Sequence, residues 1–314
     1  MFSYHEQLTL RLAAGLGEVD EATRTRHSRF LLGKQQPDGG FAGREGASDL
    51  YYTSFGLRSL AILGELHGSV AEHAAEFLTT RLAGHESVVD FMSLIYSAKL
   101  LETAAGIDIF TDASADWRRS VADTLNALRR DDGGYAKGPE GMASSTYHTF
   151  LVLLCLQLIQ QPIQQPESMV TFLLSQESDE GGFREIRASK RAGTNPTAAA
   201  IGALRILDSL TEEIIDGTLD FLVDMQNDEG GLRANTRIPI ADVLSTFTGM
   251  LTLTDLEALD EIDQNDALTY VRSLEQDNGG FFGAAWDEVA DVEYTFYGLG
   301  SLALLHVPSH FTLD

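Results

Sequence analysis

Six of the 22 basic residues of this chain fall in two short segments, residues 183–193 and 232–241. They are Arg184, Arg187, Lys190 and Arg191 in the first segment, and Arg233 and Arg237 in the second. Guanidinium and ammonium groups donate charge-assisted hydrogen bonds to phosphate oxygens, so this density predicts an anion-binding site. The alternative is that these side chains form only surface ion pairs, for example with Glu185, which contribute little to stability.

A third segment, residues 283–295, is acidic and has no basic residue. It carries Asp287, Glu288, Asp291 and Glu293. Asp291 and Glu293 are expected at a helix start, where Asp291 would cap the helix and Glu293 would lie in its first turn, and the helix dipole favours both.

These segments are loops of an internal repeat, which is marked by a pair of glycines after acidic residues. The first glycines are Gly39, Gly133, Gly181, Gly230 and Gly279, so three spacings are 48 or 49 residues and the first is 94. The long spacing indicates a copy that has lost its glycines, near residues 83–89. The chain therefore contains six copies, at about residues 20–64, 70–105, 115–160, 166–209, 212–257 and 263–306.

Each copy consists of an apolar-periodic segment, the glycine turn, a loop, and a second apolar segment. The lengths and the 3.6-residue spacing predict two helices per copy. Expected N-caps of the second helices are Asp49, Asp90, Ser145, Asp242 and Asp291. The second segments are apolar nearly all round, so we expect them inside and the more charged first helices outside. The sequence thus predicts an all-α fold, an α6/α6 barrel that forms a single domain from residue 1 to residue 314.

Composition excludes several classes of function. The formal charge of −25 disfavours binding to nucleic acid or to an anionic membrane surface. The single cysteine, Cys155, cannot form an internal disulfide and excludes a Cys/His zinc cluster. The sequence has no apolar run long enough for a membrane span, and residues 1–20 do not read as a signal peptide. These features predict a cytoplasmic protein.

The glycine turn in residues 35–41 and the Tyr-Thr helix start at Tyr294 and Thr295 carry a resemblance. Together they resemble the repeat shared by protein prenyltransferase β subunits and squalene or terpene cyclases, over about residues 22–305. The resemblance implies a barrel with an apolar central funnel whose active end is where the second helices start. Six helix N-termini at one mouth would suit an anion such as diphosphate.

In prenyltransferase β subunits the resemblance implies a zinc ion held by Asp, Cys and His. Asp242 matches the Asp, but Leu244 stands at the Cys position and Tyr294 at the His position. One carboxylate does not hold zinc alone, because such sites use at least three protein ligands. We therefore predict no zinc and no other cofactor, with Mg²⁺ only as a partner of a diphosphate. Asp242 stays a candidate catalytic residue, with a helix cap as the alternative.

The resemblance also implies residues that bind substrate. Besides the basic loops, the candidates lie where the second helices begin: Tyr52, Tyr147, His148, Tyr294 and Phe296. Such aromatic rings line an isoprenoid pocket in the superfamily and can face a carbocation. Tyr52, Tyr147 and Tyr294 are expected to share one register. The alternative is that these rings are ordinary core and that His148 is a hydrogen-bonded wall residue.

Three functions follow from these observations. The first is an isoprenoid-handling transferase of the prenyltransferase β-subunit type, which binds a prenyl diphosphate without zinc. The second is a protonation-initiated terpene cyclase, because residues 291–295 resemble the protonation motif of class II terpene cyclases, although Tyr294 stands in place of one of its acids. In such motifs clustered carboxylates raise the pKa of one acid, so the resemblance makes Asp291 and Glu293 candidate catalytic residues. The third is a barrel without catalysis that binds a lipid or a protein, because one fold can host several functions. The sequence leaves open the acceptor, an α-type partner subunit and a homodimer.

Overall fold

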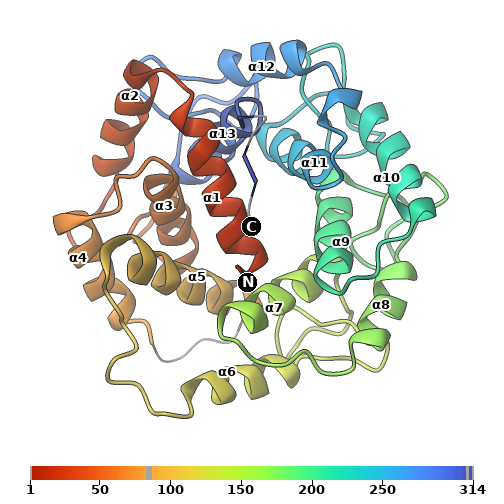
Figure 1. The fold of residues 1–314 in the computed structure, drawn as a ribbon, viewed down its shortest axis with the longest axis horizontal. Coiled ribbons are helices and arrows are strands. Elements are labelled where there is room, and N and C mark those ends of the chain that lie inside the picture. Colours follow the sequence, from red (N-terminus) through yellow and green to blue (C-terminus); the bar gives the residue numbers. More distant parts are fainter. Residues whose placement is uncertain (1, 83–86, 309–310, 313–314) are drawn as a thin grey trace. The chain divides into compact units, whose positions relative to one another are not determined.

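The computed structural model describes residues 2–82, 87–308 and 311–312. In this part of the chain every element longer than an isolated bridge is helical, which confirms the all-α prediction. The helices are α1 (Tyr4–Gly17), α2 (Glu21–Leu32), α3 (Leu50–Ile62), α4 (Gly68–Thr79), α5 (Val88–Ala105), α6 (Trp117–Asn126), α7 (Thr146–Leu158), α8 (Pro166–Leu174), α9 (Thr194–Ile206), α10 (Glu212–Met225), α11 (Val243–Asp255), η1 (Leu259–Glu261), α12 (Gln264–Ser273) and α13 (Val292–Leu304) (Figure 1). Helices α2 to α13 form the six expected pairs, and α1 is an additional helix that the repeat does not predict. None of these helices is long and apolar enough to cross a membrane.

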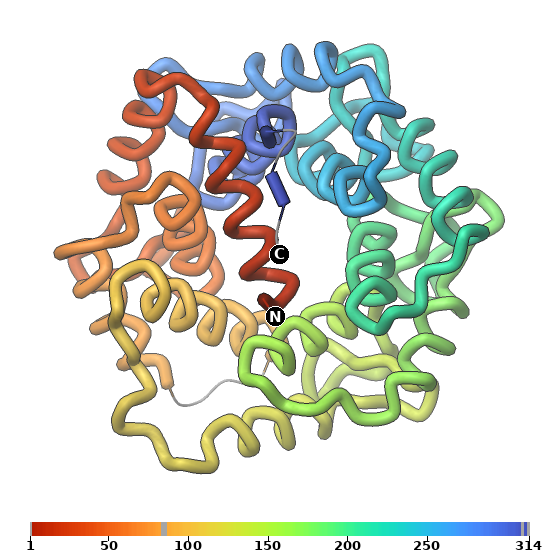
Figure 2. Tube along the Cα trace, viewed as in Figure 1, coloured from red at the N-terminus to blue at the C-terminus, as the bar shows by residue number. Residues whose placement is uncertain are grey.

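The chain divides into two compact units. The first unit combines both ends of the chain, residues 1–117 and 271–314, and the second is residues 118–270. In the first unit α3 packs between α5 and α13, and α1 lies against α13 and α3, so the red and blue ends of the trace meet (Figure 2). In the second unit α9 packs between α7 and α11. The second helices of successive copies therefore pack on one another within each unit.

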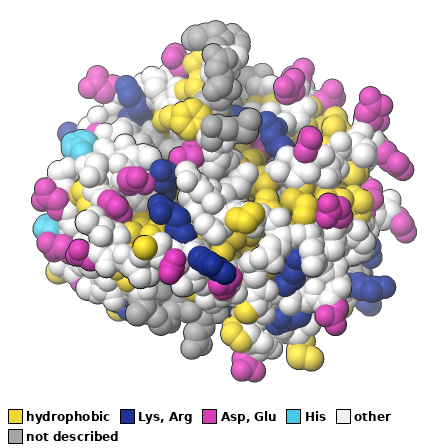
Figure 3. All heavy atoms as spheres, turned by 60° about the horizontal axis from the view of Figure 1, so that its bottom comes forward, with side chains coloured by type: hydrophobic (Ala, Val, Ile, Leu, Met, Phe, Trp, Pro, Cys, Tyr) yellow, Lys and Arg dark blue, Asp and Glu magenta, His cyan; other side chains and the backbone are white. Residues whose placement is uncertain are grey.

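The second helices are also the more buried members of their pairs. Every residue of α7 from Leu151 to Leu156 is buried, whereas α6 buries only Ala122 and Leu125. Figure 3 shows the polar counterpart, with acidic side chains spread over the face that it draws. This distribution follows from the apolar composition of the second helices, because burial of apolar surface is the main force for folding.

Four of the five predicted caps are present. The side chains of Asp49, Ser145, Asp242 and Asp291 each accept a hydrogen bond from the backbone N–H three residues later. Asp90 was expected to cap α5, and this prediction is wrong. The cap is Ser87, whose Oγ accepts from the N–H of Asp90, so Asp90 lies in the first turn. The predicted turn near residues 83–89 falls mostly on residues 83–86, which lie outside the described part of the chain.

A threonine ties each glycine turn to the second helix of its own copy. The backbone N–H of the residue after the glycine pair donates to a threonine Oγ1, as in Phe41 to Thr53 at 2.9 Å. The same bond recurs at Tyr135–Thr149, Phe183–Thr197, Leu232–Thr246 and Phe281–Thr295. The turn therefore stands in a fixed place at the start of each second helix, and the loop that follows it begins there.

Each first glycine also contacts the next copy. Gly39 has a φ of +87°, and a Cβ atom on it would lie 2.0 Å from the carbonyl oxygen of His73 in α4. Gly279 stands in the same relation to Arg26 of α2, at 2.6 Å. The sixth copy therefore packs on the first copy within the first unit.

Candidate functional site

The two basic loops of the second unit lie side by side. The backbone N–H of Thr194 donates to the carbonyl of Ala234 at 3.0 Å, and the Thr194 hydroxyl donates to the carbonyl of Arg233. A further bond joins Arg191 Nη1 to the hydroxyl of Thr236 at 2.9 Å. The loops thus meet where α9 begins, and the N-terminus of α11 follows the second loop directly.

Three of the six basic side chains in these loops already have protein partners. Arg184 and Arg233 take the same place after the glycine turn, and each donates to carbonyls at the end of the preceding first helix. Arg191 forms an ion pair with Glu180 at 2.8 Å. Arg184 and Arg233 therefore fix the loops, which leaves their guanidinium groups fewer donors for a ligand.

The other three basic side chains are exposed. Arg187, Lys190 and Arg237 all have open surface on the two loops, and the structure gives their side chains no ion pair or hydrogen bond within the described residues. Because no acidic side chain is paired with them, their positive charge is not neutralised locally in a protein that carries −25 overall. On the two basic loops these three side chains are the groups that can receive an anion.

The start of α7 lies beside the first of these loops. Ser145 donates to Glu185, and the Thr146 backbone N–H donates to the Glu185 carbonyl at 2.9 Å. His148 Nδ1 lies 2.7 Å from Ser145 Oγ, and burial lowers the His148 pKa to about 4, with Lys137 adding to the shift. His148 is therefore neutral at pH 7, while Tyr147 next to it is 40% exposed.

Asp242 caps α11 and has no partner that suggests a metal. Its Oδ1 accepts from the Ser245 N–H at 2.7 Å, and its Oδ2 accepts from the Ser245 hydroxyl at 2.8 Å. Burial raises the Asp242 pKa, and these hydrogen bonds oppose the shift. Within the described residues no three His, Cys, Asp or Glu side chains are arranged to hold a metal ion. Leu244 and Tyr294, at the other two zinc positions that the resemblance implies, add no Cys or His side chain.

The acidic loop of the first unit is neutralised by an arginine from a distant part of the sequence. Arg44 Nε donates to Asp291 Oδ2 at 2.9 Å, and the two Arg44 Nη atoms form a bidentate ion pair with the carboxylate of Asp287. Asp291 is 5% exposed and also caps α13 through the Tyr294 N–H. Both oxygens of Asp291 are therefore engaged, one by the cap and one by Arg44.

Glu293 has a different environment. Its Oε1 accepts a hydrogen bond from the Tyr51 hydroxyl at 2.6 Å. Burial raises the Glu293 pKa, while the Tyr51 hydrogen bond opposes the rise. The net direction for Glu293 is a raised pKa, with burial as the largest cause.

Aromatic rings continue from Glu293 along α3 and α13. Phe55 lies 5.0 Å from Tyr51 and 5.3 Å from Tyr297, measured between ring centroids. Phe296 is buried at 1% exposure and lies 5.7 Å from Phe55. These rings form one cluster within the first unit.

The predicted register of the tyrosines needs a correction. Tyr52 and Tyr294 are the third residues after the N-caps Asp49 and Asp291. Tyr147 is only the second residue after Ser145, so His148 takes the place of Tyr52 and Tyr294. The prediction of a shared register is therefore wrong for Tyr147, which instead matches Tyr51 and Glu293.

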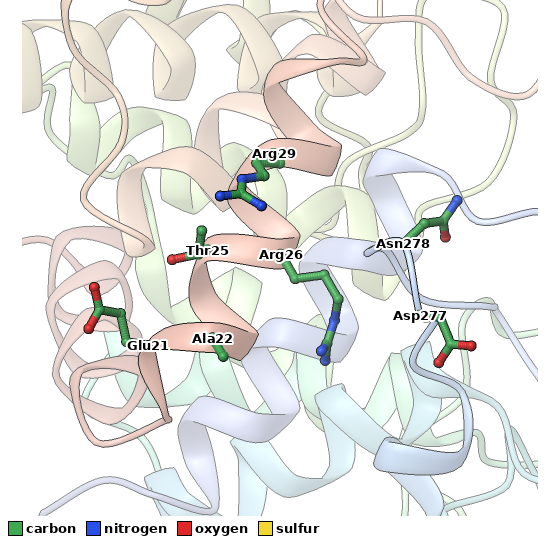
Figure 4. Close-up of a pocket in the computed structure, with 7 residues that line it drawn as sticks. All are labelled: Glu21, Ala22, Thr25, Arg26, Arg29, Asp277 and Asn278. Atoms are coloured by element: carbon green, nitrogen blue, oxygen red, sulfur yellow. The ribbon is translucent and has the colours of Figure 1, made fainter.

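A surface pocket of about 660 Å³ lies elsewhere on the first unit (Figure 4). It is lined by Glu21, Ala22, Thr25, Arg26, Arg29, Asp277 and Asn278, from α2 and the last glycine turn. Its charged side chains have both signs, and none of the residues predicted from the sequence lines it. This pocket is therefore separate from the candidate site.

The comparisons identify the family. The model of the prenyltransferase alpha-alpha toroid domain matches residues 8–79, 89–237 and 160–314. The chain belongs to this family. No curated protein matches the chain. The toroid fold that the family name describes is the fold expected from the repeats.

Solved structures show the same fold at low sequence identity. Protein geranylgeranyltransferase-I of Candida albicans, complexed with GGPP, has a TM-score of 0.71 and 15% identity, over 91% of this chain and 96% of that one. The type II terpene cyclase MstE from Scytonema, in complex with geranylgeranyl dihydroxybenzoate, has a TM-score of 0.63 and 13% identity, over 96% of this chain and 99% of that one. An α-1,6-mannanase of Salegentibacter has a TM-score of 0.56 and 11% identity, over 96% of this chain and 98% of that one. These proteins share a fold but differ in function, so the function of this chain has to be argued from the residues of its own site.

Several residues of the site were missed by sequence reasoning. Arg44 pairs with Asp291 across 247 positions of sequence, and Tyr51 pairs with Glu293 across 242. Arg58 lies on the aromatic cluster and was not a candidate. The signal for Tyr51 was its place two residues after a cap, the same place as Glu293; the sequence has no corresponding signal for Arg44.

Proposed function

We propose that this protein handles isoprenoids as a transferase of the prenyltransferase type, and that it binds a prenyl diphosphate at the basic loops of the second unit. Arg187, Lys190 and Arg237 would hold the phosphate oxygens, and the backbone N–H of Asn195 at the start of α9 would add a further donor. Arg191 and Arg233 would keep the loops in place. The observation that carries this proposal is the group of three exposed, unpaired cations in a protein of charge −25.

The surrounding residues are consistent with this role. Tyr147 and His148 lie at the start of α7, next to the first basic loop, and offer an exposed ring and a neutral imidazole to an apolar chain. Asp242 would stay a cap and would not bind a metal. Mg²⁺ would enter only with the diphosphate.

The variant Arg187→Ala/Lys190→Ala is expected to bind prenyl diphosphates about tenfold more weakly, because two charge-assisted hydrogen bonds are lost. Titration calorimetry with farnesyl and geranylgeranyl diphosphate at low salt measures the change. Arg118→Ala/Arg119→Ala removes the same charge from exposed positions in the same unit and should leave the affinity unchanged. Equal affinities of the wild type and the loop variant, or equal losses in both variants, would contradict the proposal.

A second function is favoured by one observation in the first unit. Glu293 has a raised pKa, a hydrogen bond from Tyr51 and a neighbouring aromatic cluster. A protonated carboxyl group beside aromatic faces could transfer its proton to an alkene, and the rings would stabilise the cation that results. Asp291 would not be this acid, because the cap and Arg44 engage both of its oxygens.

The two acids can be separated by conservative substitutions. If Glu293 is the acid, Glu293→Gln should abolish cyclisation of a polyprene without loss of diphosphate, while the melting temperature stays nearly constant. Asp291→Asn should instead lower the stability by about 1–2 kcal/mol, because it weakens a cap and an ion pair. Product analysis and thermal unfolding measure both effects. A Glu293→Gln variant that cyclises at the wild-type rate would rule out this second function.

A further inference from the structure

Arg58 in α3 lies among aromatic rings from three helices. Its guanidinium carbon is 3.9 Å from the ring centroid of Phe296 in α13, 5.0 Å from Phe55 in α3 and 5.3 Å from Tyr96 in α5. Stacking on rings holds a guanidinium group in place and attracts its charge. A π face, however, satisfies few of its five N–H donors.

The charge of Arg58 is not neutralised by a carboxylate. Some other arginines of the first unit have acidic partners: Arg44 pairs with Asp287 and Asp291, and Arg272 pairs with Glu275. Among the described residues no carboxylate forms an ion pair with Arg58, and its Nε is buried without a hydrogen-bond partner. A cation that is partly withdrawn from water without an anion is unfavourable, so the site lacks a negative group.

Titratable groups of the neighbouring helices interact with Arg58, namely His5 of α1, Tyr96 of α5 and Glu293 of α13. His5 of α1 is 7% exposed and stacks on Tyr96 at 4.2 Å, and its Nδ1 has no partner. Burial, and then the charge of Arg58, hold the pKa of His5 well below its usual range. The Tyr96 hydroxyl lies 2.6 Å from the Thr9 hydroxyl and 3.4 Å from the His5 carbonyl, both in α1. The charge of Arg58 also acts on Glu293, where it opposes the rise in pKa that burial causes, and Glu293 Oε1 accepts a hydrogen bond from Tyr51.

We propose that Arg58 binds an oxyanion, a carboxylate or a phosphate, at the end of a mostly apolar ligand. Because Nε is buried, the oxyanion would bind to the two Nη atoms. The unpartnered Nδ1 of His5 is the second polar group of this site. The apolar part of the ligand would contact the rings of Tyr51, Phe55 and Tyr297.

This site is independent of the basic loops. It lies in the first unit, rests on residues of α1, α3, α5 and α13, and involves none of the cations proposed to hold a diphosphate. If both sites exist, an enzyme of the proposed kind would take a second, anionic reactant at Arg58. If no diphosphate binds to the basic loops, the proposal for Arg58 is unaffected, and the ligand there would be an acidic lipid.

The test uses the full chain and three probes with one apolar tail: farnesoic acid, farnesyl monophosphate and farnesol. Arg58→Gln should weaken binding of both anions about tenfold or more and leave farnesol binding unchanged, while Arg58→Lys should keep part of the affinity. Arg81→Gln is the matched control, because Arg81 also stacks on a ring of the first unit, Phe77 at 5.0 Å. Arg187→Ala/Lys190→Ala should not change binding of farnesoic acid. A preference for one of the two anions identifies carboxylate or phosphate as the natural group.

Equal losses for farnesoic acid and farnesol in Arg58→Gln would overturn the proposal, because they would indicate that Arg58 only shapes the cluster. Unchanged affinity for both anions would overturn it as well. If Arg58→Gln does not fold, a crystal structure of the wild-type protein with farnesoic acid decides. A carboxylate about 3 Å from the Nη atoms of Arg58 supports the site, and a carboxylate bound elsewhere overturns it.

Discussion

Acidification below pH 6 is expected to destabilise the protein through His27. The side chain of His27 is fully buried between α2 and the last glycine turn. Its Nδ1 accepts a hydrogen bond from the Gly280 N–H at 3.0 Å, so its Nε2 carries the proton and donates to Glu275 at 3.0 Å. Burial lowers the His27 pKa to about 3, and the charges of Arg26 and Arg272 add to the shift.

The direction of the effect follows from the two states of this side chain. In the unfolded chain His27 has a pKa near 6.5, so between pH 6.5 and about 3 the unfolded state binds a proton that the folded state does not. The contribution of neutral His27 is complete above pH 6.5 and decreases by about 1.4 kcal/mol for each pH unit below it. It reaches a loss of about 4–5 kcal/mol near pH 3.

Urea unfolding of the wild type and of His27→Gln between pH 7 and pH 4.5 measures this contribution. The difference in unfolding free energy between the two proteins should shrink as the pH falls, because only the wild type loses the contribution of His27. His73→Gln is the control, since His73 is exposed on α4 and should leave the wild-type pH dependence unchanged. Parallel pH curves for the wild type and His27→Gln would show that the His27 hydrogen bonds do not set the acid stability.

The repeat made most of the fold predictable. Gly39, Gly133, Gly181, Gly230 and Gly279 recur at nearly constant spacing, and each turn is tied to its copy by a threonine. Each copy of the repeat predicts the same pair of helices independently, so a wrong assignment in one copy changes the predicted fold little. Where a copy lacks its glycines the prediction failed, as at Asp90, because the cap Ser87 could not be aligned to the other copies.

Helix α1 lies outside the repeat, and local signals could have found it. Ser3 and Glu6 form a capping box, and Leu8, Leu12 and Leu16 recur every four residues and are buried. This S-x-x-E pattern before a periodic apolar stripe is a known helix start. The contact of α1 with α13 could not be predicted, because it joins segments that are almost 300 positions apart.

The positions of the candidate site could be predicted better than the roles of its residues. Alignment of the copies placed the two basic loops next to each other, as Thr194 and Ala234 now show. The alignment could not show which of the basic side chains bond to other protein groups. Arg184 and Arg233 stand at equivalent places in their copies, which was a signal for the structural role that both have. Ion pairs such as Arg44–Asp291 join the first and sixth copies, and one sequence carries no signal for such a pair.

Gly39→Ala is expected to destabilise the protein by about 3–5 kcal/mol, because two costs add. Gly39 has a φ of +87°, which an alanine adopts at a cost of about 1–2 kcal/mol. Its Cβ would lie 2.0 Å from the carbonyl oxygen of His73, so α4 would have to move away from the turn, at a further cost of about 1–3 kcal/mol. Thermal and urea unfolding of Gly39→Ala against the wild type measure the sum.

Gly64→Ala separates these two costs. Gly64 also has a positive φ, +76°, but no atom lies within 4 Å of the place of its Cβ. This variant should therefore lose only the backbone term, about 1–2 kcal/mol. The difference between the two variants then measures how tightly the glycine turn of the first copy is packed on α4. If Gly39→Ala costs no more than Gly64→Ala, the turn and α4 can separate without loss, and the contact between successive copies is not what requires the first glycine of the pair.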